Sequence, residues 1–245
     1  MSKKIWIYGI HAVGAALKNP KRTCFQLNVL TQSLKQEVHS TASGIPCNIV
    51  DKSFFIKRFG ENAVHQGVAL ELLCLEEPAL EDLCDEPLAG QIILALDQVT
   101  DPHNVGAIIR SAAAFGARAI ITQERHAPEK TSAVLAKTAC GGLEHIDWIS
   151  VTNLSRALEQ LKQAGYWVSG LDEGGEPLTP STAPSRPLVL VLGAEGEGLR
   201  RLVKENCDFL VRLPTMPNFG TLNVSNAAAV ALYACAAQGE KEKHK

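Results

Sequence analysis

The 245-residue sequence contains no apolar run of the roughly 18–20 residues that a membrane-spanning helix requires. Its longest apolar run, residues 227–237, is too short and is rich in alanine. Residues 1–4 begin as a secretory signal would, but Gly9, His11 and Gly14 interrupt the apolar segment that should follow. We therefore expect a cytoplasmic protein with no membrane partner.

A Cys-x-x-Cys pair is also missing, although the sequence has seven cysteines. Most of them lie in apolar sequence, which indicates buried, reduced thiols and argues against a disulfide framework. His103 stands at no ligand spacing from a Cys, Asp or Glu, and such a residue is more often a turn or packing element than a catalytic base. We expect no metal site.

A strong net charge is absent as well, since the formal charge is only −2. The charges are nevertheless unevenly distributed: residues 1–71 hold nine Lys and Arg against four Asp and Glu, so the remainder holds 24 − 9 = 15 against 26 − 4 = 22. A basic segment before an acidic one is typical of a protein whose first part binds a polyanion. A solvated basic surface without a partner would explain the distribution equally well.

The first part of the chain resembles a small mixed α/β module over residues 1–75. Short apolar runs alternate there with helix-like stretches. The apolar runs are residues 26–31, 45–50 and 67–75, and the helix-like stretches are residues 9–17, 34–41 and 52–59. The acidic segment 76–90 contains two prolines, which predicts a linker.

Residues 91–245 show a regular alternation of strands and helices. The predicted strands are residues 92–96, 117–122, 146–151, 166–171, 188–192 and 209–213, and the predicted helices include residues 105–115, 131–140 and 154–164. Strands that are apolar throughout predict a parallel sheet with both faces covered. Ligands of such sheets bind beyond the carboxyl ends of the strands, so we expect a site after Leu96, Leu192 and Leu213.

The first of these segments, residues 97–111, contains a predicted helix start. Pro102 disfavours a helical conformation of the residue before it, and Asn104 is predicted to cap the helix. Gly106 and Arg110 are four residues apart and share one helical face. This pattern suits a ligand that approaches the helix closely beside a guanidinium group, or an ordinary cap followed by a surface arginine.

The second segment is glycine-rich, with Gly193, Gly196 and Gly198 in the order G-x-x-G-x-G. This order differs from the G-x-G-x-x-G of dinucleotide-binding folds, which argues against a nicotinamide-dependent dehydrogenase. Glu195 and Glu197 would repel phosphate groups. A cofactor without phosphate, such as the cationic S-adenosylmethionine, fits better, and a tight turn with exposed glutamates is the alternative.

The third segment, residues 213–227, combines two prolines and a glycine in an irregular loop before an alanine-rich helix. Asn223 or Ser225 is predicted to cap that helix. Capping accounts for one of these polar residues, but hardly for both.

In order and spacing along residues 91–240, the three segments resemble motifs one to three of the SpoU (TrmH) family of SPOUT methyltransferases. Residues 8–13 and 65–68 are similar to the beginning and end of the L30e-like RNA-binding domain of members that act on ribosomal RNA. Departures from the family pattern are Thr221, where serine is usual, Pro217, where glycine is common, and Phe219-Gly220; they concern the fit of the substrate.

The resemblance implies an α/β protein with an L30e-like domain at 1–75, a linker at 76–90 and a SPOUT domain at 91–245 whose C-terminal chain threads a trefoil knot. It further implies a homodimer that binds S-adenosylmethionine through Gly193, Leu213 and Leu222, with Gly198 nearby. The implied activity is methylation of a ribose 2′-hydroxyl in RNA, of a guanosine of 23S rRNA near the peptidyl-transferase centre. A tRNA methyltransferase and a non-catalytic RNA-binding ribosome assembly factor are the alternatives.

The resemblance also assigns catalytic roles to Asn104, Arg110, Glu195, Asn223 and Ser225. Because arginine almost never loses its proton, with a pKa above about 12, we expect Arg110 to stabilise the developing alkoxide and hold the adjacent phosphate rather than to act as a base. Glu195 and Asn223 would orient the arginine and the hydroxyl, and Asn104 would shape the turn.

Overall fold

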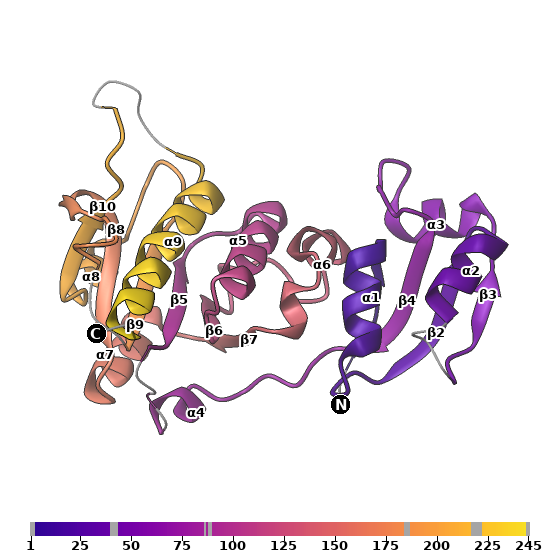
Figure 1. Ribbon diagram of the computed structural model, residues 1–245, viewed down its shortest axis with the longest axis horizontal. Helices are drawn as coiled ribbons and strands as arrows, with labels where there is room; N and C mark the ends of the chain where they lie inside the picture. Colours follow the sequence, from indigo (N-terminus) through magenta and orange to yellow (C-terminus); the bar gives the residue numbers. More distant parts are fainter. Residues whose placement is uncertain are drawn as a thin grey trace. The chain divides into compact units, whose positions relative to one another are not determined.

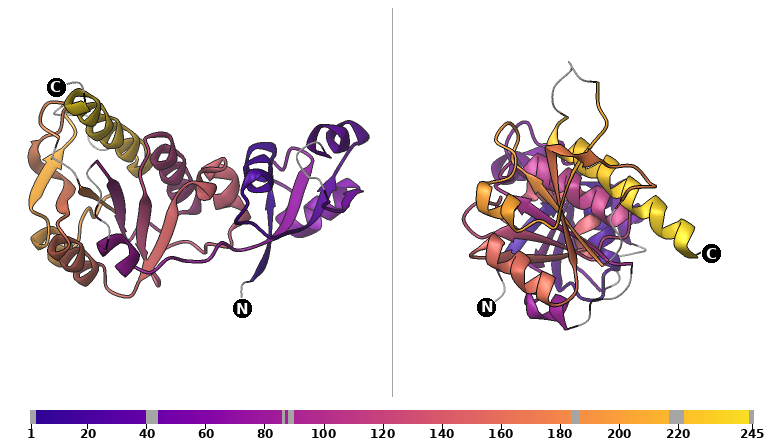
Figure 2. Two further views of the ribbon diagram at one scale, coloured as in Figure 1. Left: turned by 60° about the horizontal axis from the view of Figure 1, so that its bottom comes forward. Right: turned by 90° about the vertical axis from the view of Figure 1, so that its left-hand side faces the viewer.

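The computed structural model describes residues 3–39, 44–85, 87, 90–183, 187–216 and 222–243. The chain forms two compact units (Figures 1 and 2). Unit 1 comprises Met1–Glu76 with Glu129–Glu144, and unit 2 comprises Glu77–Pro128 with His145–Lys245.

Unit 1 contains a four-stranded sheet in the order β1-β4-β2-β3, in which β4 is antiparallel to β1 and β2 while β3 is parallel to β2. Its strands are β1 (Lys4–Tyr8), β2 (Cys24–Val29), β3 (Cys47–Ile49) and β4 (Val68–Leu73). Its helices are α1 (Ile10–Lys18), α2 (Gln32–His39), α3 (Lys52–Phe59) and α6 (Ala133–Ala139), with a short 3₁₀ helix η1 (Gly142–Glu144). The predicted runs and helix-like stretches of residues 1–75 all correspond to elements of this unit, whereas β1 was not predicted.

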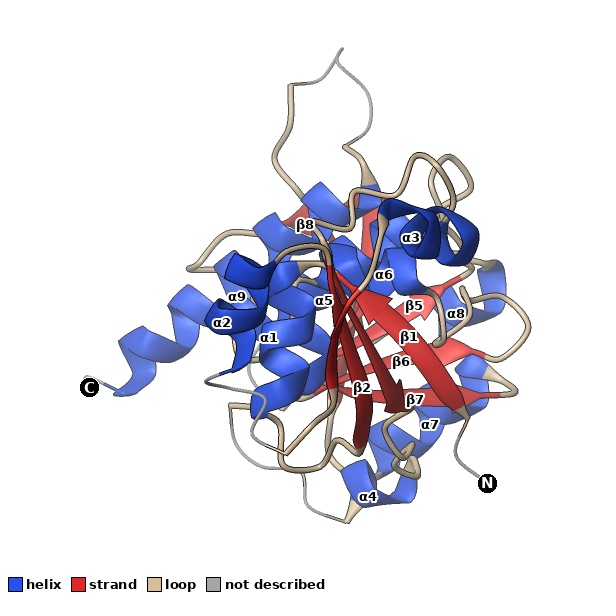
Figure 3. Ribbon diagram, turned by 90° about the vertical axis from the view of Figure 1, so that its right-hand side faces the viewer, coloured by secondary structure: helices blue, strands red, loops and turns tan. Residues whose placement is uncertain are grey.

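The two faces of this sheet bury different side chains because successive residues of a strand point to opposite sides. Ile7, Leu27 and Leu70 pack with α1 and α2 on one face, whereas Tyr8 and Ala69 pack with α3 on the other. Figure 3 shows these helices around the strands. Helix α3 therefore closes a small second core of its own.

The two family-like segments of unit 1, residues 8–13 and 65–68, meet where α1 and β4 begin, and the Gly9 N–H donates to the Val68 carbonyl at 3.2 Å. Gly9 precedes α1 with φ 94° and offers no side chain for capping, so Gln66 Oε1 accepts the hydrogen bond from the Ile10 N–H at 3.1 Å instead. His65 Nδ1 accepts from the Gly67 N–H at 3.0 Å, and the His65 ring stacks on Phe55 with centroids 4.1 Å apart. These signature residues thus hold the start of α1.

The domain assignment of residues Glu129–Glu144 was predicted wrongly, because the prediction placed their helix in the second domain. By its contacts this segment belongs to unit 1. Ala136 joins the apolar core of unit 1, and Glu144 forms a buried ion pair with Arg22 at 2.8 Å, with both side chains 5% exposed. The chain therefore leaves unit 2 after its second strand and returns before its third.

Unit 2 contains a six-stranded, wholly parallel sheet in the order β10-β8-β9-β5-β6-β7, which confirms the predicted parallel sheet. Its strands are β5 (Ile92–Asp97), β6 (Ala119–Gln123), β7 (Asp147–Val151), β8 (Trp167–Pro177), β9 (Leu188–Gly193) and β10 (Phe209–Arg212). All six were predicted, but β8 extends six residues beyond its predicted end.

Helices cover both faces of this sheet. They are α4 (Glu81–Cys84), α5 (Pro102–Ala114), α7 (Leu154–Gln163), α8 (Arg201–Glu205) and α9 (Val224–Lys243). Helices α4, α7 and α8 contribute buried residues to one face, and α5 and α9 lie side by side on the other (Figure 1). The segment predicted as a linker is partly structured, since it contains α4 and buries Leu80 and Leu83. No helix of the described residues is both long and apolar enough to cross a bilayer.

Candidate active site

A cavity of about 940 Å³ opens at the carboxyl ends of β9 and β10, beside residues 171–173 in the middle of β8. All four residues expected to bind the cofactor line it: Gly193, Gly198, Leu213 and Leu222. The remaining lining residues are Leu171, Asp172, Glu173, Leu192, Ala194, Glu195, Gly196, Glu197, Arg212, Thr215, Met216, Asn223, Val224 and Ala227. The structure thus brings the second and third predicted segments to one cavity.

The glycine-rich loop after β9 folds back on itself. The Gly198 N–H donates to the Ala194 carbonyl at 3.0 Å, and the two residues form an isolated antiparallel bridge. A Cβ atom on Gly193 would lie 2.2 Å from the Gly198 carbonyl carbon, so only glycine fits there. Gly196 and Gly198 have φ of 82° and 68°, which side chains rarely tolerate. The glycine spacing therefore serves a tight loop rather than a phosphate cradle.

The three predicted segments meet at one carboxylate oxygen. Glu195 Oε1 accepts hydrogen bonds from Asn223 Nδ2 at 2.6 Å, from Asn104 Nδ2 at 3.1 Å and from the Val224 N–H at 3.3 Å. Asn223 Nδ2 also donates to Asn104 Oδ1 at 3.0 Å. We call Asn104, Glu195 and Asn223 the carboxamide junction. It joins the first turn of α5, the glycine-rich loop and the start of α9.

Asn223 caps helix α9, as predicted for Asn223 or Ser225. Its Oδ1 accepts from the Ser225 N–H at 2.9 Å and from Ser225 Oγ at 2.6 Å. The two polar residues therefore act together. Ser225 donates to Oδ1 of Asn223 and so orients its side-chain amide, and Nδ2 of Asn223 donates to Glu195 and Asn104 in the junction.

The predicted cap of α5 was wrong. Asp101, not Asn104, is the N-cap residue, and its carboxylate accepts from the His103 N–H at 2.8 Å. Pro102 takes the first helical position, which suits its fixed φ and its missing N–H. Asn104 consequently lies inside the first turn, where its side chain reaches Glu195.

No hydrogen bond joins Arg110 to the carboxamide junction in the part of the chain that the structure describes. Arg110 is exposed on α5, and within the described ranges its guanidinium group makes no hydrogen bond or ion pair. Gly106, one turn earlier, is buried. The guanidinium group is therefore available to a ligand.

Carboxylates dominate the charge around the cavity. Asp172, Glu173, Glu195 and Glu197 line it, and Arg212 is the only cation among the lining residues. Burial opposes ionisation of Asp172, but hydrogen bonds from Lys204 Nζ and from the Gly174 N–H, both at 2.9 Å, lower the pKa of its carboxyl below the ordinary value. The cavity thus favours a positively charged ligand.

The wall that contains Asp172 comes from an irregularity in β8 that was not predicted. Leu210 of β10 pairs with Gly170, but the next residue pairs with Glu176, so residues 171–175 bulge out of the ladder. A Cβ atom on Gly175 would lie 2.5 Å from the Leu210 carbonyl carbon. The consecutive glycines 174 and 175 were the available signal of such a bulge.

A second group missed from the sequence anchors the end of the glycine-rich loop. The fully buried Asp97 accepts from the Arg200 N–H at 2.9 Å and from Arg200 Nε at 2.7 Å. Arg200 Nη2 donates to Gln123 Oε1 at 2.6 Å. An aspartate at the end of a wholly apolar strand could have indicated such a buried partner.

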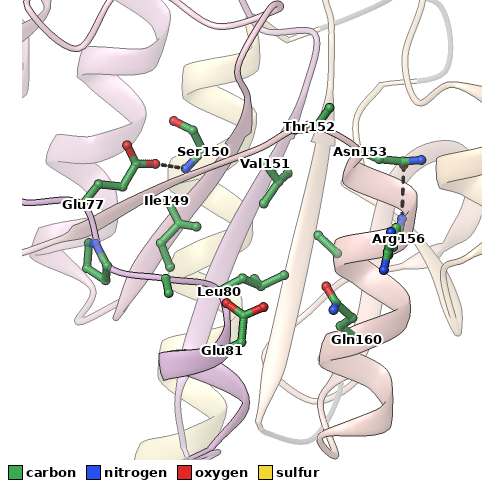
Figure 4. A pocket seen from close by; sticks show the side chains of 13 residues that line it. Glu77, Leu80, Glu81, Ile149, Ser150, Val151, Thr152, Asn153, Arg156 and Gln160 are labelled. Atoms are coloured by element: carbon green, nitrogen blue, oxygen red, sulfur yellow. Dashed lines mark hydrogen bonds between the residues drawn. The ribbon is translucent and has the colours of Figure 1, made fainter.

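A smaller cavity of about 500 Å³ lies between residues 77–81 and the segment from β7 to α7 (Figure 4). Two of its lining side chains make local hydrogen bonds: Glu77 accepts from the Ser150 N–H, and Asn153 caps α7 by accepting from the Arg156 N–H. None of the predicted site residues lines it.

Pro217, Phe219, Gly220 and Thr221, the departures from the family pattern, lie outside the described residues. Among the described residues, no group of three or more His, Cys, Asp or Glu side chains could hold a metal ion.

Two family models match the chain. One is described as the SpoU rRNA Methylase family and matches residues 91–233, and the other is described as RNA 2′-O ribose methyltransferase substrate binding and matches residues 6–76.

Several proteins are similar over nearly the full length. The chain is 37% identical over 249 residues to the 23S rRNA (guanosine-2′-O-)-methyltransferase RlmB of Pseudomonas putida, covering 99% of this chain and 100% of that protein. It is 39% identical to RlmB of Haemophilus influenzae, covering 93% and 95%. An uncharacterised tRNA/rRNA methyltransferase of Synechocystis is 38% identical, and the matched region spans 61% of that longer protein.

Solved structures share the fold. The SpoU methyltransferase AviRb of Streptomyces viridochromogenes in complex with AdoMet has a TM-score of 0.81 at 20% identity, covering 97% of this chain and 91% of that one. An AdoMet-bound rRNA methyltransferase of Sinorhizobium meliloti has a TM-score of 0.77 at 24% identity, covering 95% and 86%.

Proposed function

Because the chain belongs to the SpoU rRNA methylase family, we propose that it methylates the 2′-hydroxyl of a guanosine ribose in 23S rRNA, with S-adenosylmethionine as methyl donor. The observation that carries this proposal is the carboxamide junction, which ties three distant segments together beside a cavity rich in carboxylates. The full-length similarity to RlmB proteins supports the substrate, and we propose a nucleotide near the peptidyl-transferase centre.

The residues of the cavity fit S-adenosylmethionine. A volume of about 940 Å³ suits a ligand of this size, and the surplus of carboxylates suits its positive charge. We propose that backbone groups of Gly193, Leu213 and Leu222 hold it, with Gly198 shaping the loop beside them. When bound, S-adenosylmethionine supplies a methyl group on a positively charged sulfur atom, which an oxygen nucleophile can attack in line.

The protein contributes alignment and charge in this mechanism. The carboxamide junction fixes the start of α5 against the cavity, and so positions the helix that carries Arg110. Arg110 holds the phosphate next to the target ribose and stabilises the negative charge that develops on the 2′-oxygen. The hydroxyl proton leaves to a phosphate oxygen or to water, since a guanidinium group does not act as a base near neutral pH.

Arg110→Lys tests this assignment in single-turnover assays. Lysine keeps the charge but loses the planar, forked set of donors, so we expect a large fall in rate at every pH. Activity of Arg110→Lys that returns only at high pH would mean that residue 110 acts as the base.

A homodimer is part of the proposal, and the exposed face of α9 supports it. Asn226, Val230 and Tyr233 follow helical spacing on that face, and Val230 and Tyr233 are 47% and 58% exposed. The Tyr233 ring also packs against Phe115 at the end of α5, with centroids 6.2 Å apart. Sedimentation of Tyr233→Asp should show monomers where the unaltered protein shows dimers.

Membership of the family also supports a trefoil knot in the C-terminal chain, a cytoplasmic location, and a role of unit 1 as the RNA-binding domain. The decisive experiment is transfer of a radiolabelled methyl group, followed by mapping of 2′-O-methyl sites in a deletion strain. A missing methyl on a 23S guanosine supports the proposal. Label on tRNA would make the protein a tRNA methyltransferase, and RNA binding without transfer would make it an assembly factor.

A further inference from the structure

One face of the sheet in unit 1 carries aromatic rings beside cations. Lys4, Trp6 and Tyr8 alternate with apolar residues along β1, so they point to the face that α3 packs against. Helix α3 lies near one end of the strands (Figure 3), where Tyr8 and Ala69 are buried. Towards the other end, Lys4 is exposed and Trp6 is only half-buried.

Cations lie over the rings of this face. Lys4 Nζ is 3.8 Å from the centroid of the Phe25 ring, and Arg58 Cζ is 4.8 Å from the Trp6 centroid and 5.7 Å from that of Phe54. Trp6 and Phe54 meet edge to face at 5.2 Å. Phe25 and Phe54 are half-buried, and Arg58 is exposed. We call Lys4, Trp6, Phe25, Phe54 and Arg58 the basic aromatic face.

The surroundings of this face are polar and mainly basic. Lys52 and Lys57 are exposed on α3. The neighbouring acids are Asp51 at the start of α3 and Glu71, which pairs with Trp6 across the strands. On β2, which adjoins β4, Gln26 Nε2 donates to Oδ1 of the buried Asn28 at 2.9 Å, so this pair of amides is engaged within the sheet. The opposite face of the sheet is occupied by α1 and α2, and its core includes no aromatic ring among the described residues.

We infer that the basic aromatic face binds an unpaired stretch of RNA, with a base stacking on the Phe25 ring or on the Arg58 guanidinium group and with Lys4 near a phosphate; this inference rests on the proposed function. Single-stranded RNA is recognised through aromatic rings and guanidinium planes in a positively charged setting, which is the combination present here. A duplex hides its bases and would gain only the phosphate contacts.

Binding of two probes tests the inference: a single-stranded oligouridine of about 12 nucleotides and an RNA duplex of the same length. Phe25→Leu removes a ring but keeps an apolar side chain, and we expect roughly five- to hundredfold weaker oligouridine binding with little change for the duplex. Arg58→Lys keeps the charge and loses the stacking plane, so it should weaken the oligouridine selectively as well.

Lys4→Gln and Lys18→Gln form a matched pair, because each removes one exposed cation and Lys18 lies on α1 at the covered face. Lys4→Gln should lower the slope of log K against log salt by roughly 0.7, and Lys18→Gln should leave it unchanged. If Phe25→Leu and Arg58→Lys weakened the binding of oligouridine and of the duplex equally, the face would contact only phosphates, and the inference would be overturned. Unchanged oligouridine binding in both variants would overturn it too.

Methyl transfer separates this inference from the proposed function. In the face variants we expect a raised KM for rRNA with unchanged kcat and unchanged S-adenosylmethionine affinity. If the unaltered protein transfers no methyl group, the proposed function fails whatever the probes show. If the unaltered protein transfers methyl groups and the face variants have the same KM for rRNA, only the RNA-binding role of the basic aromatic face is refuted.

Discussion

Glu195 is the most informative residue to replace, because one of its oxygens accepts three hydrogen bonds from two other segments, from Asn104, Asn223 and the Val224 N–H. A hydrogen bond to a charged group contributes about 1.5–3 kcal/mol when it is buried. The junction is exposed, so water replaces part of what Glu195→Ala removes. We expect a net loss of about 2 kcal/mol in cofactor binding, which corresponds to a Kd for S-adenosylmethionine raised about thirtyfold.

Glu195→Gln separates the charge from the geometry. Glutamine can keep an acceptor oxygen in the same place, so only the charge-assisted part of each bond is lost, and we expect an increase in Kd of about fivefold. Isothermal titration calorimetry measures both variants. Glu197→Gln is the matched control, since Glu197 lines the same cavity from the same loop but makes no hydrogen bond to the junction among the described residues.

Two results would refute this reasoning. If Glu195→Ala binds the cofactor as the unaltered protein does, the junction does not shape the cavity. If Glu197→Gln weakens binding as much as Glu195→Gln, then the total charge of the loop matters and the hydrogen bonds do not. Circular dichroism checks that each variant is folded before its affinity is interpreted.

Three further changes test stability. Asp97→Asn should lower the free energy of unfolding by about 2 kcal/mol in urea titrations, because the buried carboxylate pairs with the half-exposed Arg200. Glu144→Gln should lower the free energy of unfolding by about 3 kcal/mol in the same assay, since it leaves the buried Arg22 without its ionic partner. Burial and the charges of Lys52 and Lys137 lower the pKa of His65, so stability should fall as the pH drops below about 6.5. His65→Asn, which keeps an acceptor but does not titrate there, should show a smaller fall in Tm over that range.

The sequence predicted most of the elements because each one follows from local information. Wholly apolar runs such as residues 188–192 identify buried parallel strands without knowledge of their neighbours. A cap of α9 at Asn223 or Ser225 follows from residue type and position, whereas the choice of Asn223 needs the structure. Strand β1 was missed because its apolar residues Ile5 and Ile7 were assigned to a signal-like start, although they alternate as in a strand.

The site could be predicted only in part, because its geometry depends on contacts between distant residues. Local rules could not tell that Asn104 would leave the capping position to Asp101 and bond to a residue 91 positions away. The bulge of β8 depends on the register with β10, which no local pattern contains. Asp97 and Arg200 can form their hydrogen bonds only once β5 and β9 are paired in the sheet.

Helix α6 shows why domain boundaries are harder to predict than helices. Its sequence predicts a helix with an apolar side, but nothing in that pattern tells which core will receive Ala136. A truncation that removes residues 1–75 would therefore also expose the apolar side of α6 and leave Glu144 without Arg22. Loss of RNA binding in such a truncated protein could not be ascribed to unit 1 alone. Single replacements on the basic aromatic face, which leave this packing in place, are the sharper test of where RNA binds.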